Sequence, residues 1–187
     1  MIAPAYDNAA LEVFKEKENI RVISVENYEK NNIDFQIQAI DGGFLIQQDD
    51  QKMVAKENLK VVTKKQPNES QLEDLMFAWK VAKYMKSNAI VFAKDLQTIG
   101  IGAGQMSRVN SAKIASLKAA ASNLDTTGAV MASDGFFPFS DSIQMASDNG
   151  IGSIIQPGGS IKDQEVIDEA NNKNISMVFT GMRHFRH

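Results

Sequence analysis

The regular alternation of short apolar runs with helical segments after residue 89 most constrains how this chain folds. The apolar runs predict strands at 89–93, 98–101, 129–132, 153–156 and 177–180, with a turn at Asp95. The amphipathic segments predict helices at 114–121, 142–146 and 165–170. Such alternation favours right-handed crossovers and a mostly parallel sheet with helices on both faces. We therefore predict an α/β fold.

Two loops in this region carry residues suited to ligand binding. One runs from Ala132 to Asp141 and follows a predicted strand, and the other runs from Gln156 to Ser160 and follows the next. Because the carboxyl ends of parallel strands meet at one edge of a sheet, both loops are expected at the same edge, where open α/β proteins bind ligands. That edge is the candidate site.

The first 66 residues predict a smaller mixed α/β piece. Asp7 is placed to cap a helix, and strands are expected at 20–25 and 59–63. Between them, residues 34–47 read as two short strands broken at the turn Asp41-Gly42-Gly43. We predict one domain over 1–66 and a second over 67–187.

A polar stretch with Pro67 marks the boundary and ends in Ser70, which has Glu73 three residues on, a capping-box pattern. The helix that follows carries an apolar stripe at helical spacing, formed by Leu72, Leu75, Met76, Trp79, Ala82 and Met85. This spacing favours a core position for Trp79 over a role in stacking on a ligand.

Composition narrows the class of protein. With 187 residues, 43% hydrophobic and 23% charged, the chain is typical of a globular protein, and its net charge of −3 does not favour nucleic acid or a membrane as partner. The absence of cysteine excludes disulfides, thiolate catalysis and thiolate zinc ligands. No apolar run approaches a membrane span, so a cytoplasmic protein is expected. Ile2 and Ala3 resemble the end of a buried strand, so a fragment is expected.

The glycines at 100, 102 and 104 lie between a strand and a helix, where free backbone N–H groups favour an anion. Their spacing is not that of a dinucleotide-binding loop and no Walker lysine follows, so a tight turn is the favoured reading and phosphate binding the other. Arg108 follows four residues after Gly104 and would reinforce an anion site.

The aromatic loop and the Ser87-Asn88 pair each have two readings. The phenylalanines around Pro138 either pack in the core or, with the loop carboxylates, form a slot for a flat heterocycle. Asp141 would accept ring N–H groups or cap the next helix. Asn88 caps or turns the chain, or else orients a polar reactant.

The C-terminal tail carries Arg183, Arg186 and both histidines, His184 and His187. Such a tail is often solvated, but its position after the last strand also fits phosphate binding by Arg183. Nothing beyond residue type supports the histidines as a metal pair.

Five ordered motifs together resemble the bifunctional purine biosynthesis family, which joins an IMP cyclohydrolase to an aminoimidazole carboxamide ribonucleotide (AICAR) transformylase. They read KSNAIV at 86–91, IGIGAGQMSR at 99–108, SDGFFPF at 133–139, QPGGS at 156–160 and RHFRH at 183–187. The resemblance covers essentially the whole chain, as the C-terminal part of the transformylase. It implies a cytidine-deaminase-like three-layer α/β sandwich without zinc, preceded by a remnant of the first transformylase subdomain.

The resemblance also implies the chemistry and the residues. The exocyclic amine of AICAR would attack the formyl group of the cosubstrate 10-formyltetrahydrofolate, with no metal required, in a homodimer. Asn88 would match the active-site asparagine. The nucleotide-binding positions would be Arg108, Phe136, Arg183 and Phe185. The folate-binding positions would be Val109, Asp141, Ser160 and Ile161.

Two departures from the family pattern bear on activity. The family's Lys-His pair, thought to move protons, would lie upstream of this sequence, and the cyclohydrolase domain is expected to be missing, so the isolated chain is expected to be inactive. Gly135 stands where an alanine is common, which is expected to loosen the loop. The alternative reading is a nucleotide-binding or structural module without catalysis of its own.

Overall fold

The computed structural model describes residues 1–17, 19–26 and 35–186. Their contacts divide the chain into one compact unit over Met1–Asp50 and another over Gln51–His187. Each unit is described by itself.

In the first unit, β1 (Ile2–Ala3) pairs in parallel with β2 (Ile23–Ser24), and α1 (Asn8–Lys15) lies between them in sequence. The predicted cap is confirmed, because the Asp7 carboxylate accepts a hydrogen bond from the Ala10 N–H at 2.7 Å. The strand predicted over 20–25 is shorter than expected.

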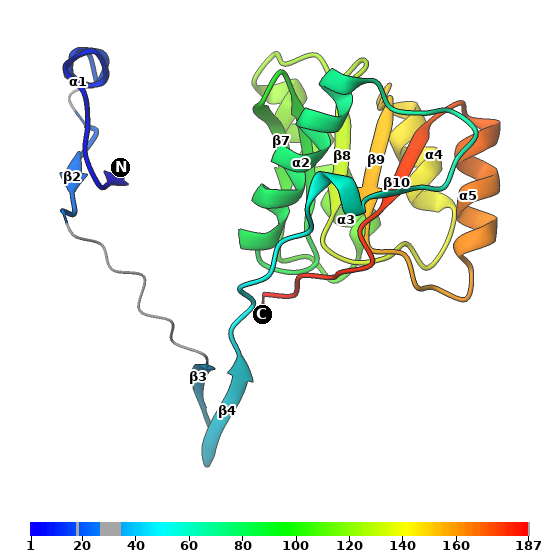
Figure 1. The fold of residues 1–187 in the computed structure, drawn as a ribbon, viewed down its shortest axis with the longest axis horizontal. Helices are drawn as coiled ribbons and strands as arrows, with labels where there is room; N and C mark the ends of the chain where they lie inside the picture. The colour runs from blue at the N-terminus through cyan, green and yellow to red at the C-terminus, as the bar shows by residue number, and fades with distance from the viewer. Residues whose placement is uncertain (18, 27–34, 187) are drawn as a thin grey trace. The chain divides into compact units, whose positions relative to one another are not determined.

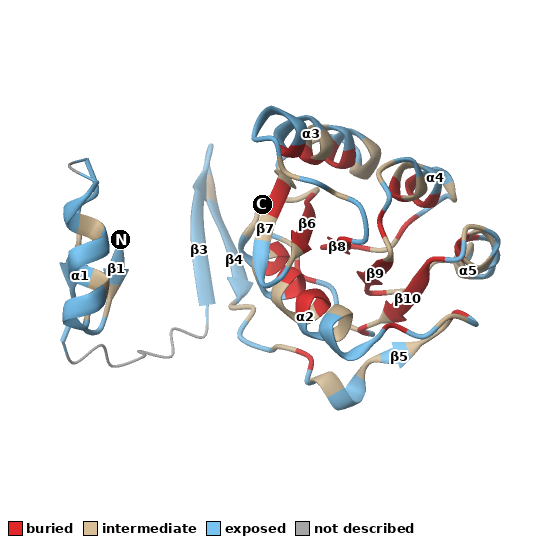
Figure 2. Ribbon diagram, turned by 90° about the horizontal axis from the view of Figure 1, so that it is seen from above, coloured by how far each residue is buried: buried red, intermediate tan, exposed pale blue. Residues whose placement is uncertain are grey.

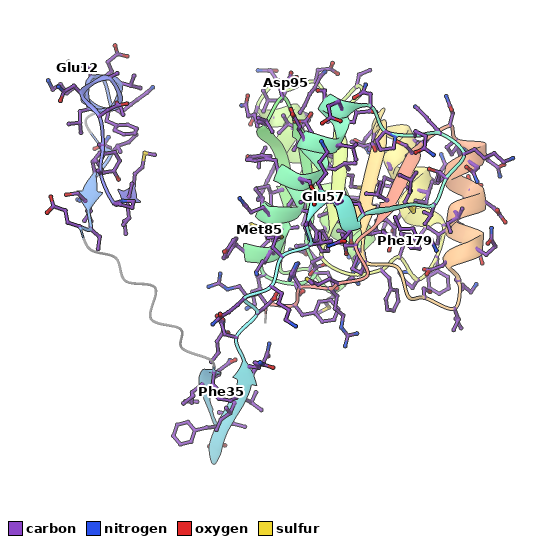
Figure 3. The ribbon with its side chains drawn as sticks, viewed as in Figure 1. Glu12, Phe35, Glu57, Met85, Asp95 and Phe179 are labelled. Carbon is purple, nitrogen blue, oxygen red and sulfur yellow. The ribbon has the colours of Figure 1, made fainter. Side chains whose placement is uncertain are left out.

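The two strands predicted between residues 34 and 47 form an antiparallel hairpin of β3 (Phe35–Ile40) and β4 (Gly43–Gln48). Residue 34 lies outside the described residues. Strand alternation places Phe35, Ile37, Phe44 and Ile46 on one face of the hairpin, and all four are more than half exposed. Phe35 is labelled on the hairpin in Figure 3.

The second unit is built on a sheet that, within residues 51–186, has six strands in the order β5-β10-β9-β8-β6-β7. These are β5 (Lys60–Val61), β6 (Ile90–Lys94), β7 (Gln97–Gly102), β8 (Val130–Ser133), β9 (Ser153–Gln156) and β10 (Ser176–Phe179). A 3-10 turn, η1 (Lys56–Asn58), precedes β5.

The prediction of a mostly parallel sheet is wrong, because the sheet is mixed. β8, β9 and β10 run parallel, whereas β5, β6 and β7 each pair antiparallel with their neighbours. For β6 and β7 the physical reason is their short connection, since a two-residue turn joins only antiparallel neighbours.

That turn is held by a buried carboxylate from a helix. Asp95 and Leu96 have φ of 53° and 56°, the left-handed region that a tight hairpin turn requires. The carboxylate of Asp74 accepts hydrogen bonds from the backbone N–H of Asp95 at 3.0 Å and of Leu96 at 2.7 Å. These bonds stabilise an otherwise unfavourable conformation of two non-glycine residues.

Helices cover both faces of the sheet (Figure 2). On one face lies α2 (Glu69–Tyr84). On the other lie α3 (Arg108–Ala121), α4 (Asp141–Asp148) and α5 (Asp163–Asn172). Each face has its own apolar core, one including Phe92, Met131 and Ile154 and the other centred on Leu75 and Trp79. Trp79 is fully buried, so the core reading is confirmed.

The cap of α2 differs from the one predicted. The capping box is formed by Asn68 and Gln71, in place of Ser70 and Glu73: the Gln71 N–H donates to Asn68 Oδ1 at 2.8 Å and the Gln71 amide accepts from the Asn68 N–H at 3.0 Å. Asparagine is as effective an N-cap residue as serine. The helix begins two residues earlier than predicted, so Asn68 takes the cap position.

The sheet brings several loops to one edge. β7, β8, β9 and β10 all end there, and β6, which runs the other way, begins there. The C-terminal tail, red in Figure 1, crosses the same edge, while the Asp95 turn labelled in Figure 3 lies at the opposite end. The predicted meeting of loops at one edge is therefore confirmed, although the sheet is mixed.

The glycine run does not form the tight turn that the sequence favours. Gly100 and Gly102 lie inside β7, where α3 packs closely against the strand. A Cβ on Gly100 would lie 2.2 Å from the Ala115 carbonyl oxygen, and one on Gly102 would lie 1.9 Å from that of Ser111. Close helix-strand contact explains both glycines, and only Gly104, at φ +69°, needs glycine for its backbone.

Gly102→Ala is expected to destabilise the second unit by about 1–3 kcal/mol, because the added methyl group forces α3 away from β7. Chemical denaturation followed by circular dichroism measures this change. Gly43→Ala is the control, since nothing lies within 4 Å of its added methyl group. Equal stability of Gly102→Ala and the wild type would contradict the close packing.

Candidate functional site

Four of the predicted site residues line one pocket at the loop-bearing edge of the sheet. This pocket has a volume of about 320 Å³ and is lined by Asn88, Arg108, Val109 and Asp141. Its remaining lining residues are Met106, Ser107, Pro138, Phe139 and Ser142. We call it the Asn88 pocket. Its residues come from the segment just before β6, from the start of α3, and from the loop before α4 and the first residues of that helix.

Three other predicted residues line a second pocket of ≈ 350 Å³, which we call the Ser160 pocket. Phe136 enters it from the loop after β8, and Ser160 and Ile161 enter it from the loop after β9. Pro138 and Phe139 border both pockets. The structure therefore places Phe136, Ser160 and Ile161 in a different pocket from Asn88, Val109 and Asp141.

The C-terminal tail lines neither pocket but packs beside Arg108. The Phe185 ring lies under two guanidinium groups, with Arg108 Cζ 5.9 Å and Arg183 Cζ 5.1 Å from its centroid. The Ser87 N–H donates to the Arg186 carbonyl at 2.9 Å. The tail is thus docked on the edge, not solvated along its length. His184 is buried with its ring centroid 5.0 Å from that of Trp79, and His187 lies outside the described residues.

Asp134 connects these segments. Its carboxylate is fully buried and accepts hydrogen bonds from the Ser87 hydroxyl and from Arg108 Nη2, the latter at 3.2 Å. Its own backbone N–H donates to the Ala89 carbonyl, and its carbonyl accepts from the His184 N–H, each at 3.3 Å. One residue at the end of β8 therefore holds the start of β6, the start of α3 and the tail.

Gly135 leaves room for this arrangement. A Cβ at position 135 would lie 2.0 Å from Arg108 Nη2 and 3.0 Å from the Phe185 ring. Gly135 itself is buried. The Arg108 guanidinium occupies the space that a side chain at position 135 would need. The looser loop expected from this glycine stays a prediction.

Asn88 is anchored by its own amide. Its Nδ2 donates to the Gln105 carbonyl at 2.9 Å, and its backbone carbonyl accepts from the Ser111 hydroxyl at 2.7 Å. The peptide bond between Ser87 and Asn88 is cis. The Gln105 carbonyl engages the amide nitrogen of Asn88. The amide oxygen, Oδ1, accepts no hydrogen bond from the described residues. Asn88 thus offers an acceptor to the pocket.

Some of the backbone N–H groups near the helix starts at this edge already donate hydrogen bonds to side chains of the same chain. The Asp163 carboxylate accepts from the backbone N–H of Gly159 at 2.7 Å and of Ser160 at 3.1 Å. The glycine loop before α5 is therefore occupied by a carboxylate. Asp141 is the first residue of α4, with Ser140 in the cap position, so its predicted capping role is wrong and its exposed carboxylate faces the Asn88 pocket.

Sequence reasoning missed Asp134 and Ser87 as parts of the site. Asp134 stood out only as one of the loop carboxylates, and Ser87 only as the neighbour of Asn88. Their importance depends on contacts that are distant in sequence: Ser87 is 47 positions from Asp134, and Arg108 is 26 positions from it. One feature of the sequence could have indicated Asp134. It directly follows a predicted buried strand, where a charge without a partner is costly.

The described residues hold no group of three or more histidines and carboxylates that could bind a metal ion. Nor does any helix among them have the length and apolar character to cross a membrane.

The sequence profile of the AICARFT/IMPCHase bienzyme family matches residues 1–118. The chain belongs to this family. Its members are bifunctional enzymes of purine biosynthesis, and the resemblance read from the five motifs is confirmed. The matched range contains both Asn88 and Arg108, and the loops after β8, β9 and β10 lie beyond it.

A solved structure is also similar to part of the chain. It is a diaminohydroxyphosphoribosylaminopyrimidine deaminase/5-amino-6-(5-phosphoribosylamino)uracil reductase from Thermotoga maritima, 16% identical, with a TM-score of 0.36. The match covers 58% of this chain and 35% of that one, so the chain spans about a third of its length. A likeness this remote carries no argument about fold or function.

Gly135→Ala is expected to displace the Arg108 guanidinium from Asp134 and to lower the free energy of unfolding by about 1–3 kcal/mol, because a buried carboxylate loses its partner. Denaturation measures the cost. The Arg108→Ala background is the matched control, since the methyl group then has room. A cost as large in that background as in the wild type would contradict the assigned role of Gly135.

Proposed function

We propose that this chain forms the nucleotide- and folate-binding part of an AICAR formyltransferase, which transfers a formyl group from 10-formyltetrahydrofolate to the exocyclic amine of AICAR in IMP biosynthesis. The observation that carries the proposal is the Asn88 pocket, which joins Asn88 and Arg108 to Val109 and Asp141. Membership of the bienzyme family supports the same reaction.

The nucleotide phosphate would bind to Arg108 and Arg183. Both guanidinium groups lie against the Phe185 ring, and Arg183 has no ion pair among the described residues. A charge-assisted hydrogen bond to phosphate from each of these two arginines would strengthen the binding of a phosphate dianion. Phe136 would lie on the side of the nucleotide that faces the Ser160 pocket.

Asn88 would orient the reacting amine. An amine on an aromatic ring is a poor nucleophile, so the transferase must position it against the formyl carbon and remove its proton. The free Oδ1 of Asn88 is suited to accept one amine N–H and so to fix the direction of the attack. An amide does not take up a proton at neutral pH, so the base is another group.

The folate would occupy the pocket wall opposite Asn88. Val109 supplies apolar surface and Asp141 a carboxylate that can accept N–H groups of a pterin ring. Ser160 and Ile161 would contact the remainder of the folate in the Ser160 pocket, across the rim of Pro138 and Phe139. The reaction needs no metal ion in this scheme.

The architecture in this proposal is cytidine-deaminase-like, with the second transformylase subdomain over 67–187 and a remnant of the first over 1–66. The helices on both faces of the sheet support it. A cytoplasmic location stays a prediction.

Calorimetric titration of the 187-residue chain with AICAR, together with a formyl-transfer assay, tests the proposal. Binding of AICAR and of a folate analogue with no turnover is the expected result, because histidine and lysine are absent from the described residues that line the Asn88 pocket. Binding of AICAR alone would favour a nucleotide-binding module, and binding of neither ligand would overturn the proposal.

Arg108→Ala and Arg183→Ala are each expected to weaken AICAR binding by about 1.5–3 kcal/mol, the range of a hydrogen bond to a charged group. Titration calorimetry measures the loss. Lys113→Ala, on the exposed side of α3, is the control. Unchanged affinity in both arginine variants would remove the phosphate assignment.

A homodimer is also part of the proposal. The hairpin of β3 and β4 exposes an apolar face formed by Phe35, Ile37, Phe44 and Ile46, and exposed faces of this kind drive association. Sedimentation velocity at micromolar concentration is expected to give a dimer or larger species. A single species at the monomer mass of 20.6 kDa would contradict it.

A further inference from the structure

We propose that Asp134 is a positioning residue, which holds the Arg108 guanidinium in the orientation that binds the phosphate of the nucleotide. The inference rests on the proposed function, since it assigns Arg108 to a phosphate. It goes further in giving a role to a buried carboxylate that touches neither pocket.

The geometry of the pair supports positioning over simple burial of charge. The Asp134 side chain has no exposed surface and that of Arg108 has 15%, so the pair lies largely out of water and its attraction is only weakly screened. Asp134 engages Arg108 through Nη2, one of three guanidinium nitrogens. The guanidinium group has five N–H donors, so one hydrogen bond to Asp134 leaves others for an anion.

The second oxygen of Asp134 is fixed independently. The Ser87 hydroxyl donates to Oδ2 while Arg108 Nη2 donates to Oδ1, so the carboxylate plane cannot rotate without breaking one of the two bonds. Ser87 directly precedes Asn88. The same carboxylate thereby fixes Arg108 relative to the segment that carries Asn88.

The Phe185 ring and the position of Gly135 restrict Arg108 on its other sides. The ring lies 5.9 Å from Arg108 Cζ, and a side chain at 135 would overlap the guanidinium. An arginine held by a carboxylate, a ring and a close backbone has little rotamer freedom left to lose on binding. Preorganisation of this kind increases affinity by removing an ordering cost.

The test compares AICAR with its riboside, which lacks the phosphate, in wild type and in Asp134→Asn. The amide keeps the size of the side chain and removes its charge. We expect at least tenfold weaker binding of AICAR and less than twofold change for the riboside, measured by calorimetry. Asp134→Glu, which keeps the charge, is expected to recover part of the AICAR affinity.

Two further variants separate positioning from general damage. In Arg108→Ala, the change Asp134→Asn should have no further effect on AICAR affinity, because Asp134 acts through Arg108. Asp74→Asn is the matched control: Asp74 is also a buried carboxylate with two hydrogen bonds, but at the opposite end of the sheet, so both affinities should stay unchanged. Equal weakening of AICAR and riboside, or an additive effect in Arg108→Ala, would overturn the proposal.

A separate readout distinguishes this inference from the proposed function. In ¹⁵N NMR spectra the protons on Arg108 Nη2, which donates to Asp134, should exchange slowly in the wild type and fast in Asp134→Asn. If the wild type binds no AICAR, the proposed function fails and this role fails with it. If AICAR binds but the Arg108 signal is unchanged in Asp134→Asn, the positioning role alone fails.

Should Asp134→Asn not fold, Ser87→Ala takes its place, because it removes the hydrogen bond that fixes the Asp134 carboxylate without altering its charge. The same selective loss of AICAR binding is expected. Loss of affinity for both ligands, or for neither, would overturn the proposal.

Discussion

The buried ion pair of Asp134 and Arg108 is the interaction on which the candidate site depends. A carboxylate at the end of β8 with no exposed surface is tolerated only when its charge is matched and its oxygens accept hydrogen bonds, and Arg108 and Ser87 meet both needs. A buried carboxylate that loses its partner typically costs about 1–3 kcal/mol of stability, and more when it stays charged. Stability and ligand geometry are therefore set by the same contacts.

The mixed sheet makes this contact possible. Because β6 runs against β8, the start of β6 lies beside the end of β8, and Ser87 reaches Asp134. In the expected, mostly parallel sheet, β6 would begin at the far end. The close packing of α3 on β7, which requires Gly100 and Gly102, then brings Arg108 to the same edge. The Asn88 pocket lies between these elements.

Local signals in the sequence were sufficient for most of the elements. The strand at 153–156 is found at those residues, and the Asp95 turn joins β6 to β7. These local signals could not predict how the strands pair. The antiparallel contact of β6 with β8 depends on residues about forty positions apart in sequence. The same limit explains the glycine run, which reads locally as a turn but packs against a helix that follows it.

For the site, the resemblance of the motifs indicated Asn88, Arg108 and the tail as candidates. The contacts among these residues are seen only in the structure. Phe185, a nucleotide-binding position in the resemblance, has its ring against Arg108 and Arg183. Asp134 could not be singled out, because its partners are distant in sequence.

Convergence of these loops on one nucleotide is the central claim, and a titration of the ¹⁵N-labelled chain with AICAR tests it most directly. The claim predicts that backbone signals of residues 87–88, 107–109, 134–136 and 183–186 shift together with a single affinity, while those of the Asp95 turn stay in place. Shifts confined to the Asp95 end of the sheet, or none at millimolar AICAR, would contradict it.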